Sequence, residues 1–512
     1  MKTFNNKLII ALSVMLFAYT FTLSAQVPNY LNYPVNRNGE LRYSFTVHSS
    51  DLVKAQKLGH AIAIEALNTN MKLDYEPNID TSLVDVIFYL SDNKICTGKY
   101  ERSFKSTKKA VSEALDIINT KFYSGTPPQH STVFEANDGY YLEYRIPSAL
   151  VLPSGRILAF IEARSSNQDQ AENDMVVKYS DDRGKSWSKL IVIDQQGEAS
   201  LNNPCTLYIP ETNQVMMVYQ CFPPNITEGN ATSQTDATVR TYIVFSDDEG
   251  ESWSKPRDIT EQVKRKEAAS YCSGPGVALR IASGEHKGRI VIPFNINGGN
   301  MWCNYLVYSD DHGKEWKMSN TQSGYGTNES QIVQINDTTL LLNARSHRFA
   351  GDTSKVAPKG WNPWNFNMVT RNRGEIKITM KGDKFEWGET IIRSDEPDPT
   401  CQGSIMRISG LDDGDISRIL LLNAANQKSG NSLNRVYAST PPSRINGEIK
   451  ISYDDSKSWS YKKRVYGNRF TEFQYSVIID LGDGWIGCFF EAHPQINYTI
   501  FNLEWLTEGE DK

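Results

Sequence analysis

Three arginines stand in or beside strand-like segments that lie far apart in the sequence. Arg145 lies within Glu-Tyr-Arg-Ile-Pro, Arg345 follows an apolar run that begins at Thr339, and Arg444 lies within Pro-Ser-Arg-Ile-Asn. The arginine guanidinium is a planar fork that donates two parallel, charge-assisted hydrogen bonds to one carboxylate. If a fold brings these side chains together, they would bind an acidic ligand, because three arginines exceed what a neutral sugar requires.

A repeated motif indicates which fold would position such side chains. Four copies of a Ser-x-Asp-x-Gly-x-x-Trp pattern occur, and Ser456 replaces the glycine in the last one; the copies end at Trp187, Trp253, Trp316 and Trp459. The pattern predicts a hairpin turn in which Asp accepts hydrogen bonds from backbone N–H groups and Gly takes a positive φ. The Trp is expected to pack back between strands, and the turn with Ser456 to be strained or differently shaped. This is the Asp box of β-propeller enzymes, which we interpret as structural rather than catalytic.

The spacing of the Asp boxes predicts a β-propeller. A degraded copy, Gly-Asp-Lys-Phe-Glu-Trp387, divides the longest gap, so that five units of 63 to 72 residues are visible. Such a length suits a four-stranded blade with long loops. Residues 130–150 and 470–508 remain, and we expect them to supply a sixth blade closed by strands from both ends. We therefore predict an all-β protein with a six-bladed propeller over residues 130–508, whose ligand-binding residues come from many blades at one end of the central channel.

The first quarter of the chain differs in composition from the rest. All ten tryptophans lie at or beyond Trp187. Residues 27–125 combine alternating strand-like segments with a short helix predicted near residues 108–119. We predict a small β-rich accessory domain here, with carbohydrate binding as one candidate role.

The N-terminal segment predicts export. A basic start, an apolar stretch over residues 8–23 and a Ser-Ala-Gln sequence are typical of a signal peptide, here residues 1–25. An uncleaved membrane anchor is the alternative interpretation. The mature protein would then be periplasmic, attached to the cell surface or secreted, because no other segment is long and apolar enough to span a bilayer.

Composition argues against several other classes of function. The net charge of −6 is mild and argues against nucleic-acid binding. The seven cysteines and seven histidines are scattered without metal-ligand spacing. One or two disulfides are compatible with an exported protein, but their pairing is not readable. Neither a phosphate-binding glycine loop nor a Ser-His-Asp pattern is present, so we expect no metal and no cofactor.

Tyr-Arg-Ile-Pro followed by Asp boxes resembles the bacterial sialidases, which are exo-acting glycoside hydrolases with a six-bladed propeller. The similarity covers roughly residues 130–505. The family's carboxylate-binding arginine triad corresponds by local motif to Arg145, Arg345 and Arg444. The resemblance implies terminal sialic acid as the substrate, on glycoproteins, glycolipids or oligosaccharides, with no cofactor.

The resemblance also implies a general acid/base. The segment from Glu162 to Asp169 resembles the family loop that carries this residue, which places the role on Asp169. Arg164, in the same segment, matches an arginine that helps to hold the sugar. Glu172 and Asp174 are the competing carboxylates, and Asp174 is expected to begin the next strand in a structural role.

The remaining catalytic roles fall on Glu329 and Tyr475 by the same resemblance. Thr-Asn-Glu-Ser matches the segment with the family's buried glutamate, and Phe-Gln-Tyr-Ser matches the segment with its nucleophilic tyrosine. An anionic nucleophile would be repelled by the carboxylate of sialic acid, whereas a neutral tyrosine is not. Because the ordinary pKa of tyrosine is about 10, the nucleophile requires a neighbouring base, here Glu329.

One position departs from the family pattern. Many members carry an Asp that contacts the 4-hydroxyl of the sugar, and this chain has Leu-Asn-Asn-Pro there, so Asn203 is expected to supply a neutral hydrogen bond. This puts the tolerance for modified sialic acids in doubt, but not the reaction class. For the acetamido pocket Gln220, Cys221 and Phe222 are candidates only.

Two rival functions remain open from the sequence. A trans-sialidase would use the same intermediate with an acceptor sugar, and predicts an aromatic clamp for which Trp361 and Trp364 are candidates. Packing in the protein interior is the alternative role for these tryptophans. A catalytically silent propeller lectin would be expected to lack at least one of Asp169, Glu329 and Tyr475, all of which are present.

Overall fold

The computed structural model describes residues 42–49, 83–90, 94–101, 121–137, 141–297, 302–352, 354, 356–362, 369–427, 444–467 and 472–512. Side chains are described from Gly125 onward. The chain divides into two compact units, Met1–Ser124 and Gly125–Lys512, and each is described by itself. The predicted signal peptide and the helix predicted near residues 108–119 lie outside the described residues.

The described part of the first unit is a β-sheet. Its strands are β1 (Arg42–Ser49), β2 (Leu83–Leu90), β3 (Lys94–Glu101) and β4 (Lys121–Ser124), in the order β1-β2-β3-β4. β1 runs parallel to β2, and the other two pairs are antiparallel. The β-branched and aromatic residues of β2, Leu-Val-Asp-Val-Ile-Phe-Tyr-Leu, favour this extended conformation.

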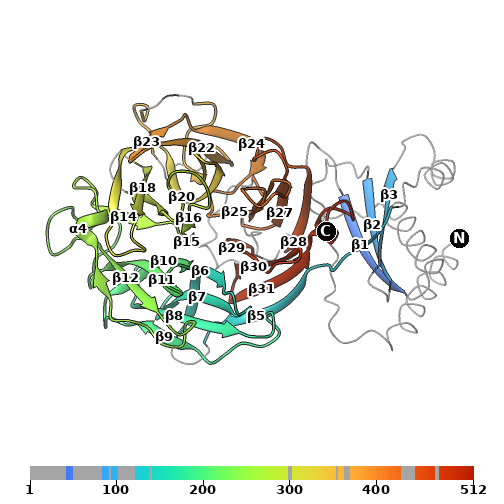
Figure 1. Ribbon diagram of the computed structural model, residues 1–512, viewed down its shortest axis with the longest axis horizontal. Helices are drawn as coiled ribbons and strands as arrows, with labels where there is room; N and C mark the ends of the chain where they lie inside the picture. Colours follow the sequence, from blue (N-terminus) through green and yellow to red (C-terminus); the bar gives the residue numbers. More distant parts are fainter. Residues whose placement is uncertain are drawn as a thin grey trace, which may run out of the picture. The chain divides into compact units, whose positions relative to one another are not determined.

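The second unit is a propeller of six blades, each built around four antiparallel strands (Figure 1). Blades 1 and 2 are joined through the single residue pair Ser200 and Asn173. A short helix, α4 (Thr260–Val263), precedes blade 3, and α5 (Leu503–Leu506) follows the last strand. Blade 1 contains β6 (Glu143–Val151), β7 (Ile157–Arg164), β8 (Asn173–Ser180) and β9 (Ile191–Asp194), and blade 2 contains β10 (Ser200–Ile209), β11 (Gln214–Phe222), β12 (Arg240–Ser246) and β13 (Arg257–Asp258). Blade 3 contains β14 (Ser270–Ser273), β17 (Ile290–Asn297), β18 (Cys303–Ser309) and β19 (Lys317–Gln322), with β16 (Leu279–Arg280) paired to β17. The short strand β15 (Gly276–Val277), in the segment that follows β14 of blade 3, pairs with β10 of blade 2.

Blades 4 to 6 complete the ring. Blade 4 contains β20 (Thr327–Asn336), β21 (Thr339–Ser346), β22 (Asn372–Lys381), β23 (Lys384–Trp387) and β24 (Ile391–Pro397). Blade 5 contains β25 (Ser404–Ser409), β26 (Arg418–Ala424), β27 (Gly447–Ser452) and β28 (Tyr461–Tyr466). Blade 6 contains β29 (Gln474–Asp480), β30 (Trp485–Ala492), β31 (Gln495–Asn502) and β5 (Gln129–Glu135). The six-bladed all-β fold predicted from the repeat is confirmed.

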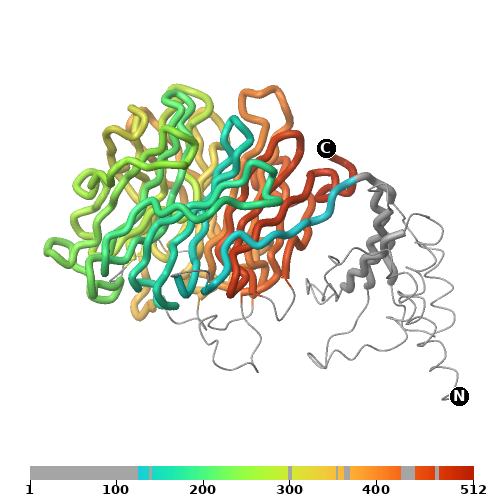
Figure 2. The backbone as a smooth tube through the Cα atoms, turned by 90° about the horizontal axis from the view of Figure 1, so that it is seen from below, coloured from blue at the N-terminus to red at the C-terminus, as the bar shows by residue number. Residues whose placement is uncertain are grey.

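Blade 6 is closed by strands from both ends of the propeller. β5 pairs antiparallel with the C-terminal strand β31, and runs beside it in the tube view (Figure 2). The prediction that residues 130–150 belong to the closing blade was wrong in its second half. β6 instead pairs with β7 and opens blade 1, because the chain must pass from the outer edge of one blade to the inner strand of the next.

The Asp boxes form the turns between the third and fourth strands of their blades. In blade 1, Ser180 Oγ accepts a hydrogen bond from the Gly184 N–H at 2.8 Å, and Asp182 Oδ1 accepts one from the Ser186 N–H at 2.9 Å. Gly184 has a φ of 83°. In the last box Ser456 has a φ of 66° and its N–H bonds to Ser452 Oγ at 2.9 Å. That turn therefore keeps the shape of the others, with a serine in the left-handed region that favours glycine.

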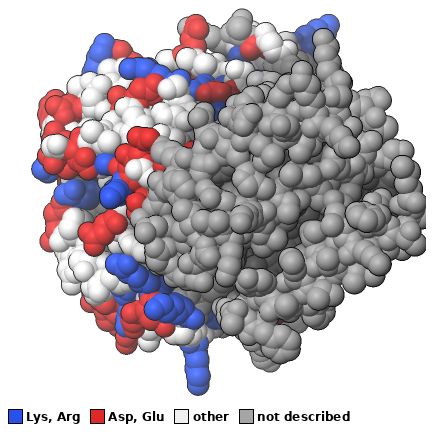
Figure 3. All heavy atoms as spheres, turned by 90° about the vertical axis from the view of Figure 1, so that its right-hand side faces the viewer, with Lys and Arg blue, Asp and Glu red and all other residues white. Residues whose placement is uncertain are grey.

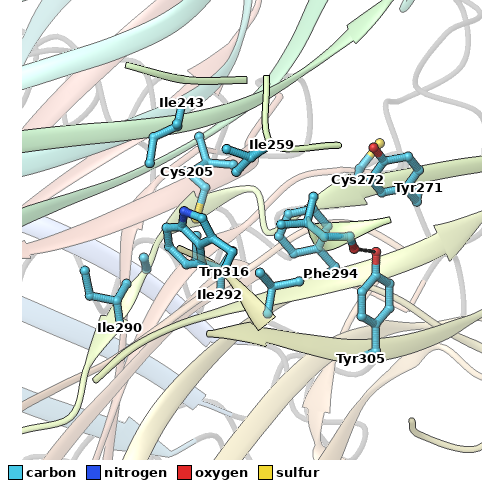
Figure 4. Close-up of a cluster of buried hydrophobic side chains, with 14 of the residues drawn as sticks. Cys205, Ile243, Ile259, Tyr271, Cys272, Ile290, Ile292, Phe294, Tyr305 and Trp316 are labelled. Carbon is cyan, nitrogen blue, oxygen red and sulfur yellow. Dashed lines mark hydrogen bonds between the residues drawn. The ribbon is translucent and has the colours of Figure 1, made fainter. Parts of the chain in front are cut away.

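The box tryptophans pack back between strands as predicted, and the strands that they contact belong to neighbouring blades. Trp187 of blade 1 lies edge-on to Phe489 and Tyr498 of blade 6, with ring centroids 5.6 and 5.7 Å apart. Trp253 of blade 2 lies edge-on to Phe160 of blade 1. Figure 4 shows Trp316 of blade 3 in the buried cluster that it shares with strands of blade 2. An indole supplies a large apolar area at each seam between blades.

Side-chain hydrogen bonds connect the innermost strands of the blades into a polar ring. Ser148 of blade 1 bonds to Thr206 Oγ1 of blade 2 and to the Gly276 carbonyl of blade 3, both at 2.6 Å. Gln331 of blade 4 donates to the Pro275 carbonyl at 3.2 Å. The Gln331 Oε1 atom accepts a bond from Ser404 Oγ of blade 5, which in turn accepts one from the backbone of blade 6.

Replacing Gly184 with alanine is expected to destabilise the propeller strongly. A Cβ atom there would lie 2.2 Å from Tyr498 Cε1, so the ring that packs on Trp187 would have to move. We expect a loss of about 2–4 kcal/mol in the free energy of unfolding, from steric overlap added to an unfavourable φ. Gly155→Ala is the matched control, because its φ is +88° but no atom lies within 4 Å of the added Cβ. Urea unfolding of both variants tests this, and equal losses would show that the overlap is relieved without cost.

The described surface and cysteines add two further facts. Lys and Arg are interspersed with Asp and Glu on the described part of the face in Figure 3. The six cysteines from Cys205 to Cys488 are buried and free, so no disulfide forms among the described side chains. Within the residues described, no helix is long and apolar enough to cross a membrane.

Candidate active site

The strand order brings the predicted residues to one end of the propeller. In an antiparallel pair, the start of one strand lies beside the end of its partner. Arg145, Glu329 and Tyr475 lie at the starts of the innermost strands β6, β20 and β29. Arg164 and Arg345 lie at the ends of their partners β7 and β21. We call this end of the channel the mouth.

β-bulges turn the side chains at the mouth. The register of the innermost strand shifts in four blades at this level: in β6, β10, β20 and β29. Bulges bend a strand and re-aim its side chains, and they are frequent beside active sites. Three of these shifts contain a non-glycine residue with positive φ, which is 61° at Ile146, 57° at Asn203 and 30° at Tyr475. Such conformations are retained only where the surrounding structure imposes them.

The three predicted arginines surround one side chain, that of Tyr475. The Cζ atoms of Arg145 and Arg444 lie 5.3 and 5.6 Å from the centroid of its ring. Arg345 Nη1 lies 3.4 Å from its phenolic oxygen. Four blades thus contribute to a single positively charged site, which can bind an anionic group beside the phenol.

Tyr475 and Glu329 form a short hydrogen bond. The hydroxyl of Tyr475 donates to Glu329 Oε1 at 2.5 Å, and Arg345 Nη1 donates to Glu329 Oε2 at 2.8 Å. Burial and the charge of Glu329 hold the pKa of Tyr475 well above its usual value, while Arg345 and Arg444 act in the opposite direction. The phenol is therefore neutral in the free protein, and its proton points at a carboxylate that can accept it.

Asp169 lies on the loop after β7, with 60% of its side chain exposed. Arg164 Nη1 donates to its Oδ1 at 2.9 Å, and Arg145 Nη1 lies 3.8 Å away. Partial desolvation by the surrounding residues acts to raise the pKa of Asp169, but these two arginines lower it to about 2. Asp174, by contrast, lies in β8 and accepts a bond from the Tyr141 hydroxyl at 2.6 Å. Among the competing carboxylates, Asp169 is the one paired with arginines of the mouth.

Two glutamates that the sequence reasoning missed hold these arginines in place. Glu491, at the end of β30, accepts bonds from Arg145 Nε and from the Ile146 N–H, both at 2.7 Å. Glu162, at the end of β7, accepts bonds from Arg164 Nη2 and from the Asn203 N–H, both at 2.6 Å. The sequence feature that could have revealed both glutamates is a charged residue near the end of an otherwise apolar strand, because burying a charge without a partner is costly.

Arg444 and Asn203 also reach the mouth. Arg444 precedes β27 and is half-buried, and its Nη1 donates to Gln474 Oε1 at 2.9 Å. Asn203 lies in the bulge of β10, and its Nδ2 donates to the carbonyl of Ser273 at 3.3 Å. Its amide is thus engaged with the backbone of blade 3, and the structure does not place it beside Tyr475.

The other candidates from the sequence lie mainly in the core. Phe222 is fully buried and Cys221 is 4% exposed, so neither offers an open wall to a ligand. Gln220 is buried but its Nε2 has no hydrogen-bond partner among the described residues. Trp361 is 7% exposed and packs against Tyr325, so it belongs to an interior cluster and is no rim platform. Its proposed companion at position 364 lies outside the described residues.

The mouth carries the chemistry of acid, base and anion binding. Over the described residues, no group of His, Cys, Asp or Glu side chains is arranged to hold a metal ion. What the geometry offers is a cluster of arginines, a neutral phenol with a carboxylate partner, and an exposed ionised carboxyl. This set can bind an acidic sugar and exchange protons with it.

The family model and the relatives that match this chain agree with one another. A family model described as a BNR repeat-like domain matches residues 155–488. A sialidase from Micromonospora viridifaciens is 29% identical over 418 residues, which covers 78% of this chain and 58% of that protein. A sialidase from Bacteroides fragilis is 24% identical over 407 residues, which covers 75% of this chain and 65% of that protein. The chain thus spans less than two thirds of the length of these two relatives.

Solved structures show the same fold. The Hadza microbial sialidase Hz136 superposes with a TM-score of 0.60 and 19% identity, which covers 80% of this chain and 74% of that one. An intramolecular trans-sialidase from Ruminococcus gnavus superposes with a TM-score of 0.58 and 21% identity, over 74% of this chain and 98% of that one.

Proposed function

The chain belongs to the BNR repeat sialidase family, and on that premise we propose that it is an exo-α-sialidase. It would hydrolyse terminal α-linked sialic acids from glycoproteins, glycolipids or oligosaccharides, with retention of configuration. The observation that carries the proposal is the convergence of Arg145, Arg345 and Arg444 on a neutral tyrosine that is hydrogen-bonded to Glu329.

The first half of the proposed reaction forms a covalent intermediate. The arginines hold the sugar carboxylate and so orient the anomeric carbon beside Tyr475. The phenolic proton passes to Glu329, and the phenolic oxygen bonds to the anomeric carbon as the glycosidic bond breaks. The leaving oxygen takes a proton from Asp169. Sialidases differ in this tyrosine nucleophile from glycosidases that use two carboxylates.

The second half of the reaction releases the sugar. Asp169, now a carboxylate, takes a proton from water, and the resulting hydroxide displaces Tyr475 from the anomeric carbon. The phenolic oxygen recovers its proton from Glu329. Two displacements at one carbon return the original configuration, which explains the proposed retention.

The charge of Asp169 must change before it can act as an acid. With a pKa of about 2 in the free protein it is ionised, because its two arginine partners outweigh the desolvation that would raise this pKa. We propose that the substrate carboxylate raises this pKa, because it adds negative charge beside Arg145 and weakens its hold on Asp169. Binding of the correct acidic sugar would thereby prepare the acid.

Asp169→Ala is expected to affect substrates according to their leaving groups. For sialyllactose, whose leaving alcohol must be protonated, we expect kcat/KM to fall by about 10²- to 10⁴-fold. For the 4-methylumbelliferyl sialoside the fall should be at least about tenfold smaller, since its acidic phenol leaves without help. Asp181→Ala, in the exposed turn of an Asp box, is the control. Equal losses on both substrates would contradict the acid role.

The basic test of the proposal is release of 4-methylumbelliferone from its sialic acid conjugate. A lectin would bind the conjugate without release. A trans-sialidase would form a second sialoside or an anhydro sugar in place of free sialic acid, and product analysis separates the two enzymes. The buried position of Trp361 removes one of the two aromatic residues on which an acceptor clamp would depend.

We also propose that the protein is exported, on the basis of its basic and apolar N-terminal segment. Fractionation of cells that produce the full chain, with N-terminal sequencing of the mature form, tests this. A protein that retains Met1 and stays with the cytoplasmic fraction would contradict it.

A further inference from the structure

The backbone of Tyr475 is held in an unfavourable conformation by a side chain next to blade 5. Its φ of 30° lies in the region that favours glycine, and such strain persists only where surrounding contacts impose it. Gln402, two residues before β25, bonds twice to Ser476: its Nε2 donates to the carbonyl at 3.0 Å, and its Oε1 accepts the N–H at 2.7 Å. This side-chain amide therefore fixes both peptide groups of Ser476, one of which is shared with Tyr475.

The residues before Gln402 also contact the site. Gln402 itself is 2% exposed, so its amide serves the interior of the propeller. Cys401 is fully buried and packs in one apolar cluster with Tyr475. The carbonyl of Thr400 accepts a hydrogen bond from Arg444 Nη2 at 3.3 Å. Three successive residues thus contact the proposed nucleophile, the residue after it, or an arginine of the mouth.

An ion pair determines the shape of this part of the chain. Residues 398–402, which we call the connecting segment, lead from the last strand of blade 4 toward the first strand of blade 5. Asp398 Oδ1 accepts the Cys401 N–H at 2.7 Å, and Asp398 Oδ2 accepts a bond from Arg373 Nη1 at 2.9 Å. Arg373 Nη1 also donates to the Cys401 carbonyl at 2.8 Å. The ion pair therefore binds both peptide groups of Cys401, as Gln402 binds those of Ser476.

The pair of Arg373 and Asp398 is buried, with exposed fractions of 0% and 1%. A buried ion pair adds little stability relative to apolar residues of the same size, and in some proteins it serves to specify one conformation. Gly403 follows the connecting segment, and a Cβ atom there would lie 2.9 Å from Arg373 Nη1. The absence of a side chain at this position leaves room for the guanidinium beside the segment that it holds.

We propose that Arg373 and Asp398 are positioning residues for the nucleophile. They fix the connecting segment, which through Cys401 and Gln402 holds the backbone at Tyr475 so that the phenolic oxygen is aimed at the anomeric carbon. The inference rests on the proposed function and deepens it. A misplacement of about 1 Å can lower a reaction rate by about 10²-fold. The effect should fall on bond formation and not on binding, because three arginines share the sugar carboxylate.

The test measures bond formation and binding separately. A sialosyl fluoride with a second fluorine at C3 loses fluoride as its sugar bonds to the nucleophile, so its inactivation rate reports bond formation. The unsaturated 2-deoxy-2,3-dehydro sialic acid does not react, so its inhibition constant reports binding. In Asp398→Asn we expect the inactivation rate and kcat for the 4-methylumbelliferyl sialoside to fall by about 10- to 100-fold. The inhibition constant should stay within about threefold of wild type.

Asp511→Asn is the matched control. Asp511 accepts bonds from Arg418 Nε and Nη2 at 2.7 and 2.8 Å, and Arg418 begins β26 at the end of blade 5 that is remote from the mouth. This variant also deprives an arginine of its carboxylate, so it should lower the free energy of unfolding but leave the inactivation rate unchanged.

Gln402→Met tests the last step of the connection. It removes both bonds to Ser476 and leaves the ion pair intact, so the inactivation rate should fall by about tenfold with an unchanged inhibition constant. If Asp398→Asn does not fold, this variant decides the question, and a wild-type rate in it overturns the inference.

Two results with folded Asp398→Asn would also overturn the inference. One is inactivation at the wild-type rate. The other is an equal loss in inactivation rate and in inhibitor affinity, which would indicate a general distortion of the mouth. If wild type neither reacts with the fluoride nor releases 4-methylumbelliferone, the proposed function fails first.

Discussion

Tyr475→Phe is expected to lower kcat for the 4-methylumbelliferyl sialoside by about 10³-fold or more, since it removes the atom that bonds to the anomeric carbon. The ring that lies beneath Arg145 and Arg444 is retained, so substrate binding should change little. KM should therefore stay within about fivefold of wild type, because only transition-state interactions are lost. Steady-state kinetics with purified protein measures both quantities.

The control for this variant is Tyr208→Phe. Tyr208 lies near the end of β10 that is remote from the mouth, and its hydroxyl donates to Asn213 at 2.8 Å. The Tyr208→Phe substitution also removes a phenolic oxygen, but outside the site, and it should leave kcat unchanged. Unchanged turnover in Tyr475→Phe would exclude it as the nucleophile. Mass spectrometry of wild type with a slowly hydrolysed fluorinated sialoside should locate the covalent sugar on the peptide that contains Tyr475.

Arg345→Ala is expected to cost about 2–5 kcal/mol in transition-state stabilisation, which is a fall in kcat/KM of about 30- to 5,000-fold. Two contacts would be lost at once, since Arg345 donates to Glu329 and lies 3.4 Å from the Tyr475 oxygen. Both kcat and KM should change, because the guanidinium binds the substrate and also orders the base. Arg345→Lys should recover only part of the loss, since an ammonium group cannot reproduce the planar fork.

A substrate methyl ester separates carboxylate binding from general damage. If Arg345 holds the carboxylate, wild type should lose activity on the ester, and Arg345→Ala should lose little more. Arg156→Ala serves as the control, because Arg156 pairs with Asp181 and Glu251 in the exposed turns at the other end of the propeller. An equal loss from Arg345→Ala on the acid and on its ester would argue for a structural role.

Much of the architecture could be predicted because it repeats. The Asp boxes recur at the same turn of four blades, where their side chains act through local hydrogen bonds and backbone φ. Together with the degraded copy that ends at Trp387 and the two leftover terminal segments, they allow the blades to be counted. The partner of each box tryptophan was not predictable in this way. Trp187 meets Phe489 and Tyr498, which lie about 300 residues away and are brought close only when the ring closes.

The residues of the candidate site also differ in whether a local motif or a distant contact defines them. Arg145 and Tyr475 could be proposed because they lie in short motifs with family counterparts. Glu491 could not, since its role is defined by Arg145, a partner distant in the sequence. Bulges add a further difficulty, because a one-residue shift in β6 or β29 changes which side chain faces the channel.

The polar ring beneath the mouth bears on how the protein could adapt to different glycans. Ser148, Gln331 and Ser404 tie neighbouring inner strands together, so separating two blades would break several buried hydrogen bonds together. The inner strands therefore form a rigid framework around the channel. Evolution toward new linkages or bulkier sugars would then proceed by exchanging the loops above these strands, such as the loop after β7, while the strands themselves remain as they are.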